Sequence, residues 1–200
     1  MTLPVGQRYD VEVVAYDAGT VTLRSHVPVQ KGGGVVLQPF DAFQVTVADD
    51  PSVTEFFAAD VGKVAPLPER APNDAKTMVF DAVQDPSNPG GVAWRINGKS
   101  MWMDPIFSFA EGATVDLTLD NQLGPEHPFH LHGQFFTILE RQGQPVTDEP
   151  GLKDTVLVPG MSKVKIRAYF DNPGRWMAHC HILEHAELGM MSEIVVTPAQ

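Results

Sequence analysis

The sequence contains a single cysteine, few basic residues and no long apolar run. A single cysteine, Cys180, excludes an internal disulfide. The 14 Lys and Arg residues are outnumbered by 25 Asp and Glu residues, which gives a net charge of −11. This balance argues against a nucleic-acid partner, because phosphate backbones are bound by surplus positive charge. No stretch approaches the roughly 20 apolar residues of a transmembrane helix, so no membrane partner is expected.

The first residues also lack the features of a secretory leader. Residues 1–6 have neither a basic start nor an apolar stretch, so we expect no signal peptide in this chain. What the sequence does have is 43% hydrophobic residues and 17 each of Gly and Pro over 200 residues. This composition is typical of a turn-rich, all-β protein of one or two domains.

Residues 1–48 are predicted to be a partial β segment. Residues 8–15 alternate between polar and apolar, and further short strands are expected at 21–24, 35–38 and 43–47. These few strands cannot bury the apolar inner face of a sheet by themselves. We therefore expect the segment to pack on the following domain or to be covered by another chain. A second interpretation is that it completes a larger barrel with the rest of the chain. Residues 49–75, rich in proline, are predicted to be a linker.

Residues 76–200 are predicted to form one β domain. Turn signals at regular intervals separate short candidate strands, which is typical of a Greek-key sandwich or barrel. The expected strands are 77–84, 93–96, 114–119, 130–139, 154–158, 163–170, 175–179 and 192–196. Residues 182–187 are expected to form a helical turn.

Six of the seven histidines lie in two short stretches of this domain. They are His127, His130 and His132 in the first stretch, and His179, His181 and His185 in the second. A lone buried cysteine is usually a small hydrophobic residue, and a lone histidine such as His26 is usually a structural or surface residue. Cys180, however, lies between two histidines, and Met190 follows it by ten positions. This concentration indicates a transition-metal site.

One thiolate, two imidazoles and a weak thioether are the ligands of a blue-copper site. Residues i and i+2 of a strand share a face, so His179 and His181 point away from Cys180. His130 and His132 likewise oppose His127, unless Pro128 bends that strand. The simplest arrangement places His127, Cys180, His185 and Met190 around one copper, with the other four histidines facing a second metal centre. Zinc also accepts Cys and His ligands, but the methionine and the many histidines fit copper better.

The stretches H-P-F-H-L-H at 127–132 and H-C-H-I-L-E-H-A-E-L-G-M at 179–190 resemble the C-terminal domain of a laccase-like multicopper oxidase. The bacterial members with an axial methionine are the most similar. The resemblance implies a cupredoxin fold over residues 76–200 and the end of a middle domain over residues 1–48. It implies the following ligands: His127, Cys180, His185 and Met190 for type 1 copper, His130 for type 2 copper, and His132, His179 and His181 for type 3 copper.

The resemblance also implies a reaction. A small reducing substrate such as a phenol or a metal ion gives single electrons to the type 1 copper. They pass through Cys180 to His179 and His181, and a trinuclear cluster reduces O2 to water. The family acts outside the cytoplasm, so a periplasmic or secreted location is expected.

The sequence departs from the family in two respects. The cluster needs four more histidines from H-x-H motifs of an N-terminal domain, and this chain has H-x-H only at 130–132 and 179–181. The missing N-terminal cupredoxin domain, as a partner chain, or symmetric copies in a homo-oligomer, must complete it. Ala186 also stands where bacterial members carry a proton-donating glutamate, which leaves the proton donor unassigned. The alternative function is a stand-alone blue-copper electron-transfer or copper-binding module without oxidase activity.

Overall fold

The computed structural model describes residues 3–8, 15, 17–32, 34–49, 70–101, 105–149 and 151–199. The chain divides into two compact units, Met1–Tyr9 with Val64–Gln200 and Asp10–Lys63, and each is described by itself. Residues 50–69 of the expected linker and most of the strand expected at 8–15 lie outside the described residues. The domain boundaries at 48 and 75 therefore stay a prediction.

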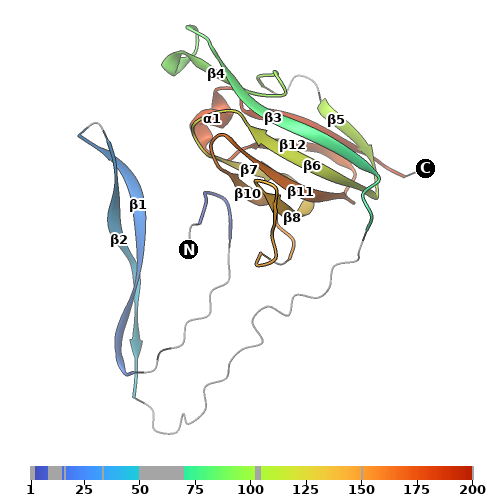
Figure 1. The fold of residues 1–200 in the computed structure, drawn as a ribbon. Coiled ribbons are helices and arrows are strands. Elements are labelled where there is room, and N and C mark those ends of the chain that lie inside the picture. The colour runs from blue at the N-terminus through green and yellow to red at the C-terminus, as the bar shows by residue number, and fades with distance from the viewer. Residues whose placement is uncertain are drawn as a thin grey trace. The chain divides into compact units, whose positions relative to one another are not determined.

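The smaller unit contains a long antiparallel hairpin of β1 (Gly19–Lys31) and β2 (Gly34–Val47) (Figure 1). The expectation of separate strands at 35–38 and 43–47 is wrong, because β2 continues through Pro39 and Phe40. The pairing register of β1 with β2 shifts between Leu23 and Arg24. Each strand of a two-stranded sheet is an edge strand, where the missing N–H of a proline is tolerated.

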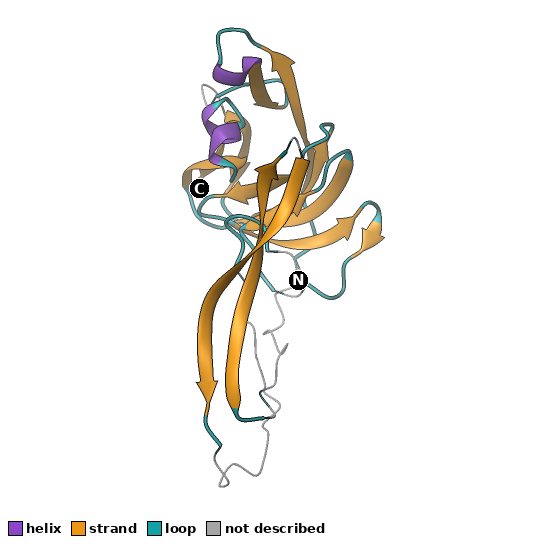
Figure 2. Cartoon of the chain, turned by 90° about the vertical axis from the view of Figure 1, so that its left-hand side faces the viewer, coloured by secondary structure: helices purple, strands orange, loops and turns teal. Residues whose placement is uncertain are grey.

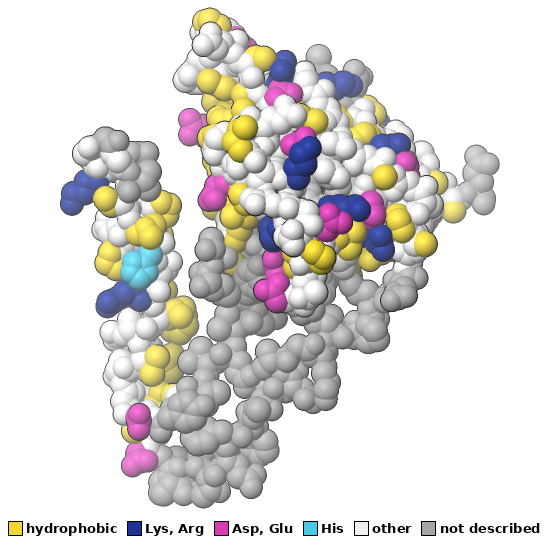
Figure 3. Space-filling view, in the orientation of Figure 1, with side chains coloured by type: hydrophobic (Ala, Val, Ile, Leu, Met, Phe, Trp, Pro, Cys, Tyr) yellow, Lys and Arg dark blue, Asp and Glu magenta, His cyan; other side chains and the backbone are white. Residues whose placement is uncertain are grey.

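The hairpin has one apolar face and one polar face. On the apolar face Val21 pairs with Val45 and Leu23 pairs with Phe43, and all four side chains are exposed. Hydrophobic side chains accordingly gather along one side of the hairpin in Figure 3. On the polar face Arg24 forms an ion pair with Asp41 at 2.6 Å.

The larger unit is a sandwich of two sheets (Figures 1 and 2). A six-stranded sheet has the order β4-β3-β6-β11-β8-β9, and a five-stranded sheet has the order β10-β7-β12-β13-β5. The strands of the first sheet are β3 (Asp74–Gln84), β4 (Val92–Ile96), β6 (Ala113–Asn121), β8 (Phe135–Arg141), β9 (Gln144–Pro145) and β11 (Ser162–Phe170). Those of the second are β5 (Pro105–Ala110), β7 (His127–Leu131), β10 (Thr155–Val158), β12 (Gly174–Cys180) and β13 (Met191–Thr197). A 3-10 turn, η1 (Pro89–Gly91), and a short helix, α1 (Leu183–Glu187), are the only described helical elements.

Strict alternation along β11 shows why the sequence folds in this way. Val164, Ile166 and Phe170 are fully buried, whereas Lys163 is exposed and Arg167 lies on the outer face in an ion pair with Asp116. Period-two alternation places every second residue on the core face of a strand. The buried residues of both sheets form one hydrophobic core, so the two sheets pack face to face. The all-β fold class predicted from the sequence is confirmed.

Phe170 offers a test of this core. Its ring is fully buried and stacks on Phe109 with centroids 4.4 Å apart. We expect Phe170→Ala to lower the free energy of unfolding by about 3–5 kcal/mol, because it leaves a cavity between the sheets. Urea denaturation measures the change. Phe135→Ala is the matched control, since Phe135 is 50% exposed and should cost less than half as much. Equal losses in the two variants would contradict the assigned core.

Two further differences from the sequence-based strands concern local geometry. Residues 130–139 form parts of two strands, β7 and β8, because Gly133 adopts a left-handed conformation with φ of +62°. The ring of Trp176 packs against Gly133, and a Cβ there would lie 2.3 Å from Trp176 Cε3. The sequence also missed β5, which pairs in parallel with β13. Among the described helices, none has the length and apolar character needed to span a membrane.

Candidate metal centres

The two histidine stretches meet on neighbouring strands of the five-stranded sheet. β7 pairs antiparallel with β12, so that His130 lies opposite His179 and Phe129 lies opposite Cys180. The N–H of His181 donates to the carbonyl of Pro128 at 2.7 Å, which extends the pairing beyond the strand. Because side chains alternate along each strand, the two stretches present one set of donors on each side of the sheet.

The first set consists of His127, Cys180 and His185. Cys180 Sγ lies 3.6 Å from His127 Nδ1 and 3.8 Å from His185 Nδ1, and the two Nδ1 atoms are 3.1 Å apart. Metal–nitrogen and metal–sulfur bonds of about 2.0–2.3 Å bring the donors of one ion to this kind of separation. One thiol and two imidazoles in a compact triangle therefore fit a single transition-metal ion.

The backbone around Met190 fixes this triangle. Cys180 N–H donates to the Met190 carbonyl at 3.1 Å, and Met190 N–H donates to the His185 carbonyl at 2.8 Å. α1 begins after Ile182 and carries His185 back toward Cys180. Ile182 N–H also points at Cys180 Sγ, at 3.4 Å. Met190 is 1% exposed and belongs to the same core cluster as Cys180.

Two aromatic side chains enclose the same triangle. Trp94 stacks on His185 with ring centroids 4.0 Å apart and meets His127 edge-on at 5.4 Å. Phe80 meets His127 edge-on at 6.1 Å. The sequence did not indicate either contact, because no spacing pattern links these aromatics to the histidines. They keep water from one side of the donors and hold both imidazoles in place.

Burial determines the protonation of this set. It raises the pKa of Cys180 to about 11 and lowers the pKa of His127 to about 4, the latter with a smaller contribution from His185. Burial also lowers the pKa of His185. At neutral pH the metal-free triangle thus holds a thiol and neutral imidazoles, with His127 Nε2 buried and lacking a hydrogen-bond partner among the described residues. Neutral imidazoles are ready to bind a metal ion, and binding displaces the thiol proton.

The buried His127 predicts how the stability of the metal-free chain depends on pH. Its folded-state pKa of about 4 lies below the ordinary value of 6.5, so the unfolded chain binds the proton more readily. The stability it contributes is complete above about pH 6.5 and declines as the pH falls toward 4. We expect a loss of about 3 kcal/mol over that interval, measured by urea denaturation. The variant His127→Gln should lack this part of the pH slope, and an unchanged slope would contradict the assignment.

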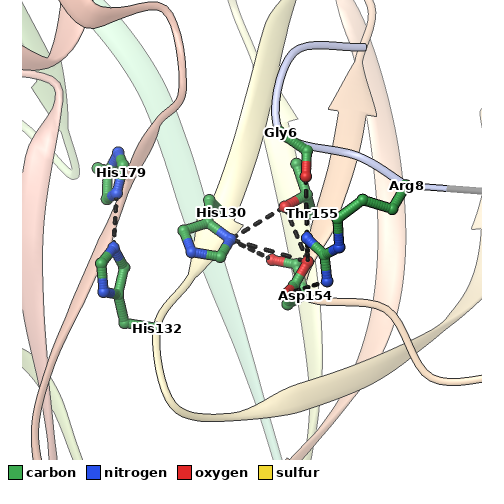
Figure 4. Close-up of polar contacts among 7 residues, drawn as sticks. All are labelled: Gly6, Arg8, His130, His132, Asp154, Thr155 and His179. Carbon is green, nitrogen blue, oxygen red and sulfur yellow. Dashed lines mark hydrogen bonds and ion pairs between the residues drawn. The ribbon is translucent and has the colours of Figure 1, made fainter. Parts of the chain in front are cut away.

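The second donor set consists of His130, His132 and His179, on the other side of the sheet from Cys180 Sγ. His132 Nε2 lies 2.9 Å from His179 Nε2 (Figure 4). His179 Nδ1 lies 2.8 Å from the Cys180 carbonyl oxygen, which can only accept, so Nδ1 carries the proton and Nε2 offers a lone pair. Burial lowers the pKa of all three histidines. Converging neutral imidazoles fit a second metal centre.

His181 lies beside this set. Its ring centroid is 5.4 Å from that of His130 and 5.7 Å from that of His179. The three-residue donor group does not include it. Its Nδ1 is buried and has no hydrogen-bond partner among the described residues. The structure thus brings together three of the four histidines expected at the second centre and places the fourth next to them.

Residues outside the two motifs also approach the second set. Asp154 and Thr155 precede and open β10, which pairs with β7 so that Thr155 lies opposite His130. Neither residue could be recognised from the sequence, since both lie in an ordinary strand pattern. At the position of the expected glutamate, Ala186 is buried on α1, whereas Glu184 and Glu187 are exposed.

Comparison with known proteins assigns the family. The sequence profile described as multicopper oxidase matches residues 69–200, which is more than half of the chain.

The chain belongs to the multicopper oxidase family. A multicopper oxidase of Staphylococcus epidermidis is 38% identical over 104 residues, covering 52% of this chain and 21% of that protein. An iron transport multicopper oxidase of Schizosaccharomyces pombe is 37% identical over 103 residues, covering 46% of this chain and 17% of that protein. Copper is the cofactor of this family, in agreement with the cofactor predicted from the sequence.

Solved structures support the same family. The chain superposes on a variant of the McoA multicopper oxidase of Aquifex aeolicus with a TM-score of 0.69 and 25% identity, covering 92% of this chain and 42% of that one. A multicopper oxidase of Pediococcus acidilactici gives a TM-score of 0.66 and 28% identity, covering 86% of this chain and 37% of that one. The cupredoxin-like fold is therefore confirmed, and the chain spans well under half the length of these multicopper oxidases.

Proposed function

We propose that this chain provides the electron-accepting copper site of a multicopper oxidase. His127, Cys180 and His185 would be the strong ligands, and Met190 would be the axial ligand of the type 1 copper. The observation that carries the proposal is the buried triangle of one sulfur and two nitrogens with sides of 3.1, 3.6 and 3.8 Å. This donor set, with a methionine whose backbone is bonded to both Cys180 and His185, suits blue copper.

The second donor set would serve the oxygen-reducing cluster. His130 would be the type 2 ligand, and His132, His179 and His181 would be type 3 ligands. Copper held by both sets supplies one-electron transfer and the reduction of O2 to water. Cys180 and His179 are neighbours in β12 with side chains on opposite faces, and His179 Nδ1–H donates to the Cys180 carbonyl at 2.8 Å. One peptide link and one hydrogen bond would therefore connect the two centres.

The second set is incomplete as a trinuclear cluster, since the chain supplies half of the histidines that the family uses. The missing ligands would come from an N-terminal cupredoxin domain, as a separate chain or as another part of the protein, or from symmetric copies of this chain. The relatives' coverage supports a further domain, because the chain spans only 21% of the Staphylococcus epidermidis protein and 42% of the McoA variant.

The substrate would be a small reductant such as a phenol or a metal ion, oxidised outside the cytoplasm in the periplasm or as a secreted protein. The relatives include both a laccase, from Fomitopsis schrenkii, and an iron transport oxidase, from Schizosaccharomyces pombe. The second candidate function is a stand-alone electron-transfer module. It is favoured by one observation, that this chain holds every ligand of the first site but lacks a full set for the second.

Anaerobic reduction followed by exposure to O2 separates the two candidates. The copper-loaded chain should be blue, and a phenolic or ferrous reductant should bleach it. As an oxidase unit, the chain regains its colour rapidly in O2 without releasing peroxide, once an oligomer or a partner domain completes the cluster. As an electron carrier, it stays bleached in every preparation. A copper-loaded chain that is never blue would contradict both candidates.

A further inference from the structure

A short segment far from the metal motifs in sequence packs against His181, beside the second donor set. Gln7 N–H donates to the Pro4 carbonyl at 3.1 Å and closes a turn in which Gly6 has φ of +84°. The backbone of Gly6 packs against the imidazole of His181 so closely that a Cβ would lie 2.4 Å from Cδ2 and 2.8 Å from Nε2. Only glycine combines this conformation with this approach.

Arg8 ties the same turn to Asp154 (Figure 4). Its Nη1 and Nη2 atoms donate to the two carboxylate oxygens of Asp154 at 3.0 and 2.7 Å, and Nη1 also donates to the Gly6 carbonyl at 3.0 Å. This is the paired, planar geometry in which arginine orients a carboxylate. The side chain of Arg8 is 70% exposed, whereas that of Asp154 is 18% exposed. The exposed guanidinium therefore orients a largely buried carboxylate.

A chain of hydrogen bonds leads from Asp154 through Thr155 to His130. Thr155 Oγ1 donates its single proton to Asp154 Oδ1 at 3.0 Å, because a carboxylate beside a guanidinium accepts. The Thr155 oxygen therefore accepts from His130 Nδ1, which lies 2.9 Å away. The Asp154 carbonyl, also 2.9 Å from His130 Nδ1, can only accept. Both contacts place the proton of neutral His130 on Nδ1 and leave the Nε2 lone pair for a metal ion.

We propose that Arg8 and Gly6 are positioning residues for the second copper centre: Arg8 fixes the tautomer and orientation of His130 through Asp154 and Thr155, and Gly6 fixes the ring of His181. The proposal rests on the proposed function only in treating these two histidines as copper ligands. Outer-shell partners of this kind orient metal-binding histidines and commonly change metal affinity 10–100-fold when removed.

Loss of Arg8 has a specific structural consequence. Without the guanidinium, each oxygen of the Asp154 carboxylate loses the donor that Arg8 supplies to it. The carboxylate, whose Oδ1 lies 3.9 Å from His130 Nδ1, is then free to turn. Thr155 thereby loses the fixed acceptor that directs its proton away from His130. An exposed ion pair contributes little to folding, so Arg8→Gln should remain folded.

Nitrogen NMR of the imidazole rings in the metal-free chain at pH 8 tests the inference without copper. His130 should show a single tautomer with the proton on Nδ1. Arg8→Gln and Asp154→Asn should both increase the fraction of His130 with the proton on Nε2, while the Asp154 carbonyl keeps the Nδ1 tautomer the major one. The double variant should resemble either single one because the two residues act as a unit. Arg70→Gln is the matched control, since Arg70 also forms an ion pair with an aspartate: its Nη1 donates to both carboxylate oxygens of Asp171, at 2.6 and 2.8 Å, and Asp171 belongs to neither donor set.

Titration of the metal-free chain with Cu²⁺, followed by electron paramagnetic resonance, gives the second measurement. The second donor set should bind a non-blue copper more weakly than the first donor set binds the blue copper. Arg8→Gln should weaken the non-blue copper about 10–100-fold and leave the blue copper unchanged. Gly6→Ala should do the same by displacing His181, and Arg8→Lys should restore part of the affinity. Arg70→Gln should match the parent chain.

The outcomes separate this inference from the proposed function. If the parent chain binds no second copper, the cluster assignment fails while the tautomer of His130 still decides the role of Arg8. If the parent binds a second copper and Arg8→Gln behaves like Arg70→Gln in both measurements, the inference is overturned and the proposed function stands. A proton found on His130 Nε2 in the parent chain also overturns it.

Discussion

We expect replacement of Cys180 by serine to abolish the blue colour of the copper-loaded chain. The colour requires a copper–thiolate bond, and Cys180 is the only cysteine. The remaining donors, His127 and His185, should hold copper more weakly by more than the 10–100-fold that loss of an outer-shell partner costs. The proposed electron route to His179 should be lost with the thiolate. Visible absorption and copper content after chromatography measure both effects.

A matched control distinguishes loss of the ligand from loss of the fold. Cys180 is 1% exposed, so the serine hydroxyl is buried and costs about 1–3 kcal/mol of stability. Ser192→Ala changes another 1% exposed small side chain, one that has no hydrogen-bond partner among the described residues. It should leave colour and copper content intact. Blue colour retained in Cys180→Ser would contradict the assignment of the type 1 site.

Replacement of His132 by glutamine should have the opposite effect on the two coppers: the non-blue copper should be lost and the blue copper kept. His132 Nε2 lies 2.9 Å from His179 Nε2 in the second donor set, and His132 is absent from the first set. The blue copper should therefore stay, whereas the non-blue copper seen on titration with excess Cu²⁺ should be lost. Electron paramagnetic resonance resolves the two signals in one sample.

His26→Gln is the matched control for this prediction. His26 lies on β1 of the hairpin and belongs to neither donor group. Its replacement should change neither copper signal. Bleaching of the blue copper in His132→Gln would show that the two sets are not separate centres.

Sequence alone predicted those features that depend on local spacing. The strand expected at 163–170 agrees with β11, and strand parity placed His130 and His179 on the side away from Cys180. The expected helical turn near His185 agrees with α1 at Leu183–Glu187. These predictions succeeded because period-two alternation and short loop spacings are properties of the chain itself.

Features that depend on contacts between distant segments were missed. Arg8 reaches Asp154 across 146 positions, and Trp94 reaches His185 between different elements. The ring of Trp176 packs against Gly133, and only the folded sheet brings it there. No periodic pattern encodes such contacts, because they arise from how the two sheets pack.

On the proposed function, this chain alone completes one copper site and only half of a second. Copper per chain, measured by elemental analysis on copper-loaded protein resolved by size, shows whether it does. We expect a blue monomer peak that retains close to a single copper per chain, with clearly more than one only in an oligomer or after addition of a partner domain. A monomer that retains a full set of several coppers, or one that holds no blue copper, would contradict the division into one complete and one half-complete site.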